Sequence, residues 1–171
     1  MNAPITWTVR PETRADVPVI HAITAAAFET PMEADLVDAL RADPAWIEGL
    51  SVVAVTPDGT VAGHALLTRC HIDGVPALCL APVSVLPEFQ KTGAGSACVR
   101  ALLEAARERG ENAVTVLGHP DYYPKFGFVR ASGHGIRPPM EVPDEAMMVL
   151  ALDPARPLPQ GTIEYAAPFG I

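Results

Sequence analysis

The stretch Gln90-Lys91-Thr92-Gly93-Ala94-Gly95-Ser96 has the residue types needed to bind an anion. It connects a strand-like run to an amphipathic helix, and the first N–H groups of a helix have no partners within it. Glycine leaves no side chain between these groups and a ligand. With the positive end of the helix dipole and the Lys91 ammonium, the turn predicts an anion site, and a pyrophosphate is its natural occupant.

Two common phosphate-binding motifs do not match this turn. A P-loop requires G-x-x-x-x-G-K-[ST], which does not occur in the sequence. A dinucleotide-binding fingerprint requires G-x-G-x-x-G, and Cys98 stands where its third glycine would be. ATP and NAD are therefore less favoured as ligands. The two glycines alone also fit a tight turn that binds nothing.

Side chains suited to proton transfer lie outside the turn. His119 follows a strand-like run and is able to deprotonate an amine through water, or else to cap the neighbouring turn. Glu33 flanks the apolar side of a predicted helix, where it either faces a cleft or is a solvated carboxylate. His64 is flanked by apolar residues, and we expect a structural histidine with satisfied hydrogen bonds. No residue spacing predicts a metal site.

The composition argues against several classes of protein. The chain has 171 residues, and its formal net charge of −8 would repel a nucleic acid. Cys70, Cys79 and Cys98 lack C-x-x-C spacing, so we expect buried free thiols in a reducing compartment. No apolar run has the length of a signal peptide or a membrane span. We therefore expect a cytoplasmic protein that does not bind membranes, with one domain over residues 1–171 and a proline-rich C-terminal segment at 154–171.

Hydrophobic spacing in the first part of the chain predicts a strand and two helices. Residues 5–9 alternate between apolar and polar types, as a half-buried strand does. A capping box, Thr13-x-x-Asp16, precedes the first helix, and Pro18 fits only in its first turn. The apolar face of the second helix is expected to consist of Met32, Leu36 and Leu40.

The middle of the chain predicts two hairpins and one long helix. Asp58-Gly59 and Asp73-Gly74 each separate β-rich runs. The strand after the second turn contains Pro82, for which we expect a bulge or an unpaired position. The helix runs from about Thr92 to Arg109. Shorter elements follow: strands at 112–118, 128–131 and 146–153, a turn or short helix at 121–127, and an edge strand around Ile163. This order predicts a mixed α/β fold with an antiparallel first half and one strand–helix–strand crossover.

These motifs resemble those of the GCN5-related N-acetyltransferase (GNAT) superfamily. Gln90-x-x-Gly93-x-Gly95 is similar to its acyl-CoA signature Q/R-x-x-G-x-G/A. "GHPDYYPKFGFVRA" is similar to its closing motif, in which a tyrosine lies four residues before Gly-Phe. "LGHPDYYPKFGF" and "VPDEAMMVLAL" look like the YhbS-like subgroup of predicted N-acetyltransferases. The agreement extends from about Ile5 to Asp153, and it implies a mostly antiparallel sheet with a splayed strand and helices on both faces.

The resemblance also implies acetyl-CoA as acyl donor and gives roles to individual residues. Backbone groups of Val83, Ser84 and Val85 would hydrogen-bond the pantetheine arm, and the Val85 N–H would also stabilise the oxyanion. Tyr123 would be the general acid for the departing thiolate, although a tyrosine pair also commonly packs in a core. The residues expected around the pyrophosphate are Gln90, Lys91, Thr92, Gly93, Ala94, Gly95 and Ser96. Thr92 and Ala94 depart from the second basic residue and large aliphatic that many members carry, so this site has less positive charge.

The leading hypothesis is an acetyl-CoA-dependent N-acyltransferase that acetylates a primary amine of a small molecule or a protein. Attack would be direct, in a ternary complex, with Glu33 or His119 as the general base. The alternative is a non-catalytic acyl-CoA-binding sensor or regulatory module. The acidic composition mildly favours a cationic acceptor. The C-terminal segment is expected to cover an edge strand or to join a homodimer interface.

Overall fold

The computed structural model describes residues 4–171, which form one nine-stranded sheet and three α-helices. The helices are α1 (Val17–Phe28), α2 (Met32–Arg41) and α3 (Ala94–Glu108). The strands are β1 (Thr8–Pro11), β2 (Trp46–Val55), β3 (Val61–Ile72), β4 (Val75–Val85), β5 (Ala113–Leu117), β6 (Val129–Arg130), β7 (Ile136–Arg137), β8 (Met147–Ala151) and β9 (Gly161–Glu164). The main strand order is β1-β2-β3-β4-β5-β8-β6, and β9 pairs with β3 and β7. The parallel pairs are β4–β5 and β7–β9. The predicted mixed, mostly antiparallel class is confirmed.

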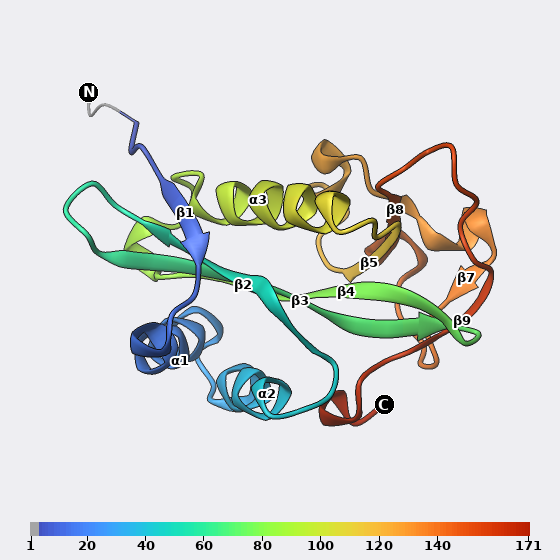
Figure 1. Ribbon diagram of the computed structural model, residues 1–171, viewed down its shortest axis with the longest axis horizontal. Coiled ribbons are helices and arrows are strands. Elements are labelled where there is room, and N and C mark those ends of the chain that lie inside the picture. Colours follow the sequence, from blue (N-terminus) through green and yellow to red (C-terminus); the bar gives the residue numbers. More distant parts are fainter. Residues whose placement is uncertain (1–3) are drawn as a thin grey trace.

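The sheet lies between helices on its two faces (Figure 1). α3 lies along one face, while α1 and α2 lie together on the other. Side chains alternate accordingly, since Leu78 packs in the cluster that contains α3 and its neighbour Cys79 packs in a cluster on the opposite face. The C-terminal segment returns toward α2, where Phe169 packs against the cluster that contains Leu40.

β4 is paired over its length along one edge only. β3 pairs with it from Val75 to Val85, with one irregularity. β5 pairs with it at two positions, Leu78 with Val114 and Cys79 with Thr115. Beyond Cys79 the two parallel strands share no paired residues, so a gap opens beside the second half of β4. This is the splayed strand that the sequence resemblance implies.

The irregularity in β4 lies at Pro82. Leu80 is paired with Leu67 and Val83 with Ala65, so β4 has one residue more than β3 in this interval. Proline has no N–H for the ladder, and a bulge is where a strand tolerates it. The predicted bulge is therefore confirmed. It also shifts the side-chain alternation: Val83 packs on the α3 face like Leu80, although it lies an odd number of positions, three, after Leu80.

Two details of the first elements differ from the sequence prediction. β1 begins at Thr8, so Ile5 and Trp7 precede the strand. α2 buries Ala34, Val37 and Leu40, whereas Met32 is 73% exposed. Of the expected stripe, Leu40 is buried and Leu36 packs against the same cluster, so the prediction was wrong at Met32. Residues at steps of four drift around a helix of 3.6 residues per turn, and small Ala34 gave a weak signal. The capping box at Thr13 and the place of Pro18 in the first turn are confirmed.

The C-terminal segment adds a strand beside the far end of β3. β9 pairs there through Ile163 with Ile72 and through Glu164 with His71, which confirms the strand expected around Ile163. Its other neighbour, β7, has only two residues and was not predicted, since so short a strand has no periodicity to detect.

His64 lies at one end of a chain of polar side chains. Its Nε2 is 2.8 Å from the Ser51 hydroxyl, which donates to Glu12. Glu12 accepts two further hydrogen bonds, at 3.1 and 3.2 Å, from Arg41. Burial lowers the pKa of His64 to about 3, so the ring is neutral near pH 7. Its Nδ1 has no partner among the described residues, so the expectation of a fully satisfied histidine holds for Nε2 only.

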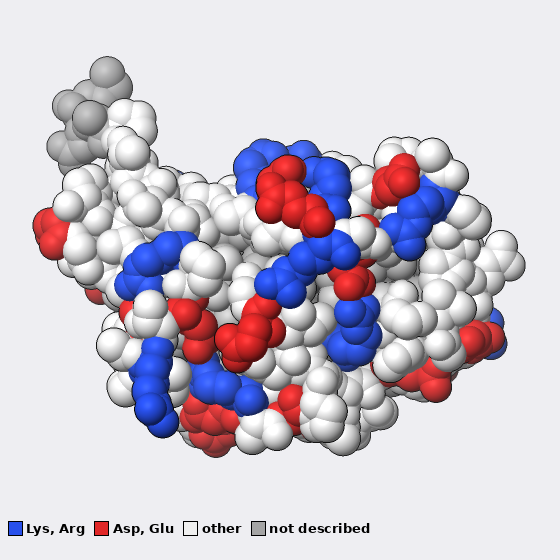
Figure 2. Space-filling view, in the orientation of Figure 1, with Lys and Arg blue, Asp and Glu red and all other residues white. Residues whose placement is uncertain are grey.

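Charged residues of both signs are mixed over the surface. On the face drawn in Figure 2, Lys and Arg side chains lie beside Asp and Glu over much of the area. Examples are the ion pairs Arg69–Glu111 and Arg107–Glu104, both at 2.7 Å. Within residues 4–171, no helix combines the length and the apolar character that crossing a membrane would require.

Candidate active site

A cavity of about 620 Å³ lies where the gap between β4 and β5 meets the beginning of α3. Three parts of the chain that are distant in sequence form its walls. The lining residues are Ala27, Phe28, Val83, Val85, Phe89, Gln90, Lys91, Gly93, Ala94, Gly95, Ser96, His119, Tyr122, Tyr123 and Lys125. The structure thus brings the glycine turn, the open edge of β4 and two predicted proton-transfer residues to one place.

The turn before α3 exposes the beginning of that helix. Lys91 has φ +62° and Gly93 has φ +92°, both in the left-handed region. α3 begins at Ala94, and no side chain within residues 4–171 caps it. The N–H groups of the first helical turn are therefore available to a ligand. A Cβ on Gly93 would have free space, so this position requires glycine for its φ.

Val85 directs backbone groups into the gap. The neighbouring Leu86 donates its N–H to the carbonyl of Ala62 in β3, at 2.9 Å. Because N–H groups alternate in direction along an antiparallel strand, the N–H and C=O of Val85 point away from β3. The Gln90 side-chain amide donates to the Val85 carbonyl at 3.3 Å, which ties the turn to the strand.

Tyr122 lies against the beginning of α3. Its hydroxyl is 2.9 Å from the Ser96 Oγ, and the Lys125 ammonium is 4.0 Å from the centre of its ring. A Cβ on Gly95 would lie 3.4 Å from this hydroxyl and 3.5 Å from Val85. A single methyl fits there in ordinary contact, but a larger side chain would fill the space between Tyr122 and β4.

Tyr123 both packs in the core and lines the cavity. Its ring meets Phe128 edge to face with centroids 5.9 Å apart, and a side chain at Gly118 would overlap it. Burial raises the pKa of Tyr123 to about 12, so the phenol keeps its proton at neutral pH. The two interpretations that the sequence left open, packing and a place at the site, therefore both describe this residue.

The two predicted bases occupy different positions. His119 lines the cavity, and its backbone carbonyl accepts the Tyr122 N–H at 3.1 Å, which closes the turn. Glu33 lies in the first turn of α2, outside the cavity lining. Its Oε2 is buried and has no hydrogen-bond partner among the described residues. Neither role as base is tested by this geometry.

Residues 20–128 match the sequence model of the acetyltransferase (GNAT) family. The chain therefore belongs to the GNAT family. It is 36% identical over 137 residues to the uncharacterized N-acetyltransferase YjhQ of Escherichia coli (strain K12), covering 77% of this chain and 75% of YjhQ. It is 32% identical over 164 residues to the uncharacterized N-acetyltransferase YhbS of the same strain, covering 94% and 97%.

Two solved GNAT structures share the whole fold. Escherichia coli YhbS in complex with CoA superposes with a TM-score of 0.90 at 28% identity, covering all of this chain and 96% of that one. A GNAT family acetyltransferase from Brucella melitensis in complex with acetyl-CoA gives a TM-score of 0.79 at 33% identity, covering 96% and 98%. These likenesses confirm the YhbS-like subgroup that the sequence motifs indicate.

Two residues of the predicted GNAT cofactor site lie outside the cavity lining. Ser84 is buried, and its hydroxyl donates to the Thr24 Oγ1 at 3.5 Å. The Thr92 hydroxyl donates to the Phe89 carbonyl, and the Thr92 carbonyl accepts the indole N–H of Trp7 at 3.0 Å. The side chains of both residues thus hold the shape of the strand and the turn.

Sequence reasoning did not assign Tyr122, Lys125 or Phe28 to the GNAT site. A signal for Tyr122 was present, because two adjacent tyrosines in a single helical turn direct their rings to different surroundings. Lys125 follows as a cation on the same turn. Phe28 had no signal, since its place in the cavity depends on how the end of α1 packs against the sheet.

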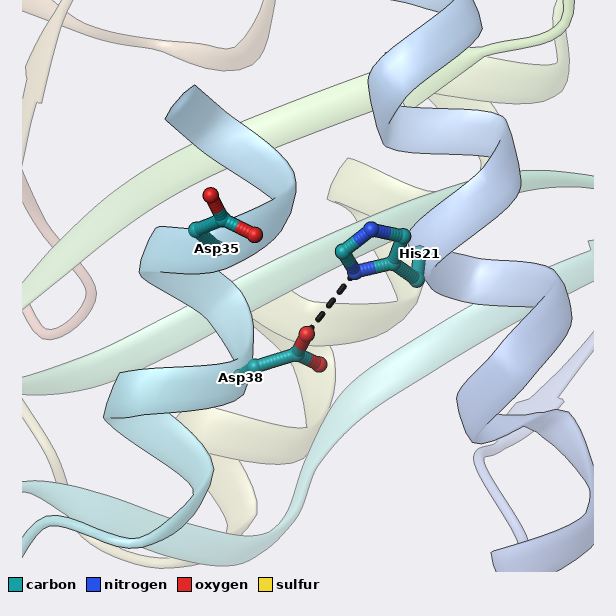
Figure 3. A group of neighbouring side chains, drawn as sticks. All are labelled: His21, Asp35 and Asp38. Carbon is teal, nitrogen blue, oxygen red and sulfur yellow. Dashed lines mark hydrogen bonds and ion pairs between the residues drawn. The ribbon is translucent and has the colours of Figure 1, made fainter. Parts of the chain in front are cut away.

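Within residues 4–171, one group of side chains has the spacing to hold a metal ion. It consists of His21 on α1 and of Asp35 and Asp38 on the facing α2 (Figure 3). Asp38 accepts hydrogen bonds from the His21 Nδ1 at 2.8 Å and from Arg41 at 3.2 Å. These hydrogen bonds account for the positions of His21 and Asp38, and none of the three residues lines the GNAT cavity.

The cysteines are buried free thiols, as predicted. Burial raises the pKa of Cys98 to about 12 and that of Cys70 to about 12 as well, and it raises that of Cys79 further. A thiolate nucleophile is therefore disfavoured at each position near neutral pH.

Proposed function

We propose that this GNAT protein transfers an acetyl group from acetyl-CoA to a primary amine. One observation carries the proposal: a single cavity contains the uncapped beginning of α3, the free backbone edge of β4 and a protonated tyrosine. An anion site, a strand edge for an extended thioester arm and a proton donor are what this reaction needs. The CoA and acetyl-CoA complexes of the two similar structures support the same ligand.

The turn before α3 binds the pyrophosphate in this proposal. The N–H groups of Gly95 and Ser96 point toward it with the positive end of the helix dipole, and Lys91 adds a charge. The pantetheine amides then pair with the backbone of Val83 and Val85 as an added strand would. Ser84 and Thr92 support this arrangement through the hydrogen bonds within the protein described above.

The reaction proceeds by direct attack in a ternary complex. The neutral amine nitrogen attacks the thioester carbonyl, a C–N bond forms, and the carbonyl oxygen becomes an oxyanion near the Val85 N–H. The C–S bond then breaks and the sulfur leaves as a thiolate. One proton is lost from the amine nitrogen, and one is taken up by the thiolate. The raised pKa values of the buried cysteines favour this route over an acyl-enzyme.

Tyr123 stabilises the leaving thiolate. Burial raises the pKa of Tyr123 to about 12, so the phenol carries its proton at neutral pH. It donates a hydrogen bond to the sulfur as negative charge develops there, and it is the proposed general acid for the departing thiolate. A proton from solvent then restores the phenol.

His119 is the proposed base, with Glu33 as the competing assignment. His119 lines the cavity, and a histidine is able to accept a proton near neutral pH. Glu33 has a buried carboxylate oxygen without a partner, which suits a bound water or a substrate group. His119→Ala and Glu33→Gln separate the two, because loss of the base lowers kcat while the affinity for acetyl-CoA stays unchanged.

The second candidate function is an acyl-CoA-binding sensor without turnover. The position of Glu33 outside the cavity lining favours it, since a catalytic base must reach the amine. Calorimetric titration with acetyl-CoA, with NAD and ATP as controls, tests the ligand, and thiol release in the presence of amines tests turnover. If the protein binds acetyl-CoA but releases no CoA thiol with any amine tested, the sensor function is the one that remains. No binding of acetyl-CoA by folded protein would overturn both functions.

A further inference from the structure

A second cavity, of about 160 Å³, borders the same gap between β4 and β5. Its walls come from β4, β5, the loop at Met140 and the C-terminal segment. The lining residues are Cys79, Leu80, Ala81, Thr115, Leu117, Met140, Tyr165, Phe169 and Ile171. Ala81, Tyr165 and Phe169 pack with Cys79 in a core cluster that contains no residue of α3. The main cavity, by contrast, is bordered by Val83, Val85 and Tyr123, which pack on the cluster of α3. The two cavities therefore border the same gap but have no lining residue in common; Leu80 of the α3 cluster also lines the second cavity, and Ala27 and Phe28 of α1 line the main one.

The position of the second cavity follows from the strand pairing. Cys79 and Thr115 form the last pair between β4 and β5, and both residues line this cavity. Two residues further along each strand, Ala81 and Leu117 line it as well. Val83, past the bulge in β4, and His119, past the end of β5, line the main cavity. A molecule in the second cavity would thus lie beside the strand positions that lead to the proposed reaction centre.

The second cavity provides an apolar surface with little free polarity. None of its lining side chains is charged at neutral pH, because burial raises the pKa of the Cys79 thiol and that of the Tyr165 phenol. The Thr115 hydroxyl already donates to the Leu78 carbonyl at 3.2 Å. The Tyr165 hydroxyl lies 3.8 Å from the Met147 sulfur. A charged or strongly hydrated group would lose its water here without gaining a partner.

We propose that this cavity binds the apolar part of the acceptor, so that the substrate is a primary amine with a hydrophobic group about as large as a benzyl group. The volume supports this size, because an apolar protein cavity of about 150 Å³ is able to hold a benzene ring. The inference rests on the proposed acetyl transfer and names its substrate class. It also makes the C-terminal segment, through Tyr165 and Phe169, a determinant of acceptor specificity.

The overall charge of the protein gives a different expectation. A net charge of −8 mildly favours a cationic acceptor such as a polyamine. The cavity beside the reaction centre contains no carboxylate side chain that would pair with a second ammonium. The side chains that line a small cavity decide what it binds, whereas long-range attraction is screened by salt. An apolar amine is therefore preferred over a diamine.

The test compares three primary amines as acceptors: benzylamine, ethanolamine and 1,4-diaminobutane. Thiol release from acetyl-CoA gives kcat/KM for each, and we expect benzylamine to exceed the other two by about tenfold or more, since burying a ring is favourable. Leu117→Trp fills the cavity and should raise the KM for benzylamine by about tenfold, with the affinity for acetyl-CoA unchanged. Val129→Trp is the matched control, because Val129 is exposed to a similar extent, 47% against 44%, and lies outside both cavities.

Binding of benzylamine to the CoA-saturated protein, measured by ligand-observed NMR, is independent of turnover. If benzylamine binds, and Leu117→Trp removes this binding while Val129→Trp keeps it, the apolar subsite is supported. This holds even if no amine is acetylated, in which case only the proposed function fails. The inference would be overturned if the protein acetylates 1,4-diaminobutane with a higher kcat/KM than benzylamine. It would also be overturned if Leu117→Trp leaves both the kinetics and the binding of benzylamine unchanged. Acetyl transfer itself would stand in either case. If Leu117→Trp does not fold, as judged by circular dichroism, Met140→Trp from the adjoining loop replaces it with the same expected results.

Discussion

β3 pairs with β4 from Val75 to Val85, whereas β5 pairs with β4 only at Leu78 and Cys79. Along the edge that faces β3, the N–H and C=O groups of β4 form hydrogen bonds within the sheet. Along the edge that faces β5, the N–H and C=O groups after the bulge are free to bind a ligand. Residues before the bulge therefore hold the fold, and residues after it form the site, so stability and binding are separable by position within one strand.

The largest effect is expected on stability, from the doubly paired half of β4. Leu78→Ala removes a fully buried side chain from the cluster beneath α3 and should lower the free energy of unfolding by about 3 kcal/mol. Urea denaturation measures this change. Val75→Ala is the control on the same strand, because Val75 is 47% exposed, and it should change stability by about 0.5 kcal/mol or less. Similar losses of stability in both variants would contradict the importance of the buried position of Leu78.

The next effect is on ligand binding at the open half. Gly95→Val fills the space between Tyr122 and Val85 and should weaken acetyl-CoA binding by about 100-fold or more. Calorimetric titration gives the dissociation constant, and thermal unfolding verifies that the fold is kept. Gly133→Val is the control, since a Cβ there meets no atom within 4 Å and Gly133 has an ordinary φ. Unchanged affinity in folded Gly95→Val would mean that the glycine turn does not bind the cofactor.

A smaller effect is expected on turnover alone. Tyr123→Phe keeps the ring against Phe128 and removes the hydroxyl, so kcat should fall by about 10- to 100-fold with acetyl-CoA affinity unchanged. Tyr122→Phe is the comparison, because it loses the hydrogen bond with Ser96 and should change affinity a few-fold instead. Full turnover in Tyr123→Phe removes this residue from the mechanism.

The smallest effect per pH unit is a pH dependence of stability that arises from His64 in β3. The pKa of buried His64 is about 3, below its ordinary 6.5, so the unfolded chain takes up the proton first as the pH falls. The stability due to neutral His64 is present above pH 6.5 and is lost toward pH 3, by up to about 1.4 kcal/mol per pH unit. Denaturation at pH 7.5, 6.5 and 5.5 should show a slope that His64→Leu removes. The same slope in both proteins would assign it to other groups, and His21→Leu is the exposed-histidine control.

Much of the fold was predictable because its signals are local. Asp58-Gly59 and Asp73-Gly74 specify hairpins, and the amphipathic run into Gly110 specifies α3, without reference to the rest of the chain. The bulge followed from Pro82 alone, since proline lacks the N–H that a ladder uses. The side-chain direction that the bulge imposes on Val83 did not follow, because it requires the register against Ala65.

The parts of the site that were missed depend on packing between distant elements. Phe28 enters the cavity through the way in which α1 crosses the sheet, and Phe169 closes the second cavity from near the end of the chain. Met32 was expected to be buried because its residue type is apolar, but Ala34 takes the buried face of α2. Spacing predicts which residues share a face of an element, and tertiary packing decides which face is covered.

Trp7 donates its indole N–H to the Thr92 carbonyl and meets the Phe89 ring edge to face with centroids 5.7 Å apart. The glycine turn therefore has a natural fluorophore beside it. The chain contains two tryptophans, so Trp46→Phe leaves Trp7 as the single indole emitter. A molecule that occupies the turn changes the surroundings of this ring, and the wavelength and intensity of its emission then report occupancy in real time without any attached dye.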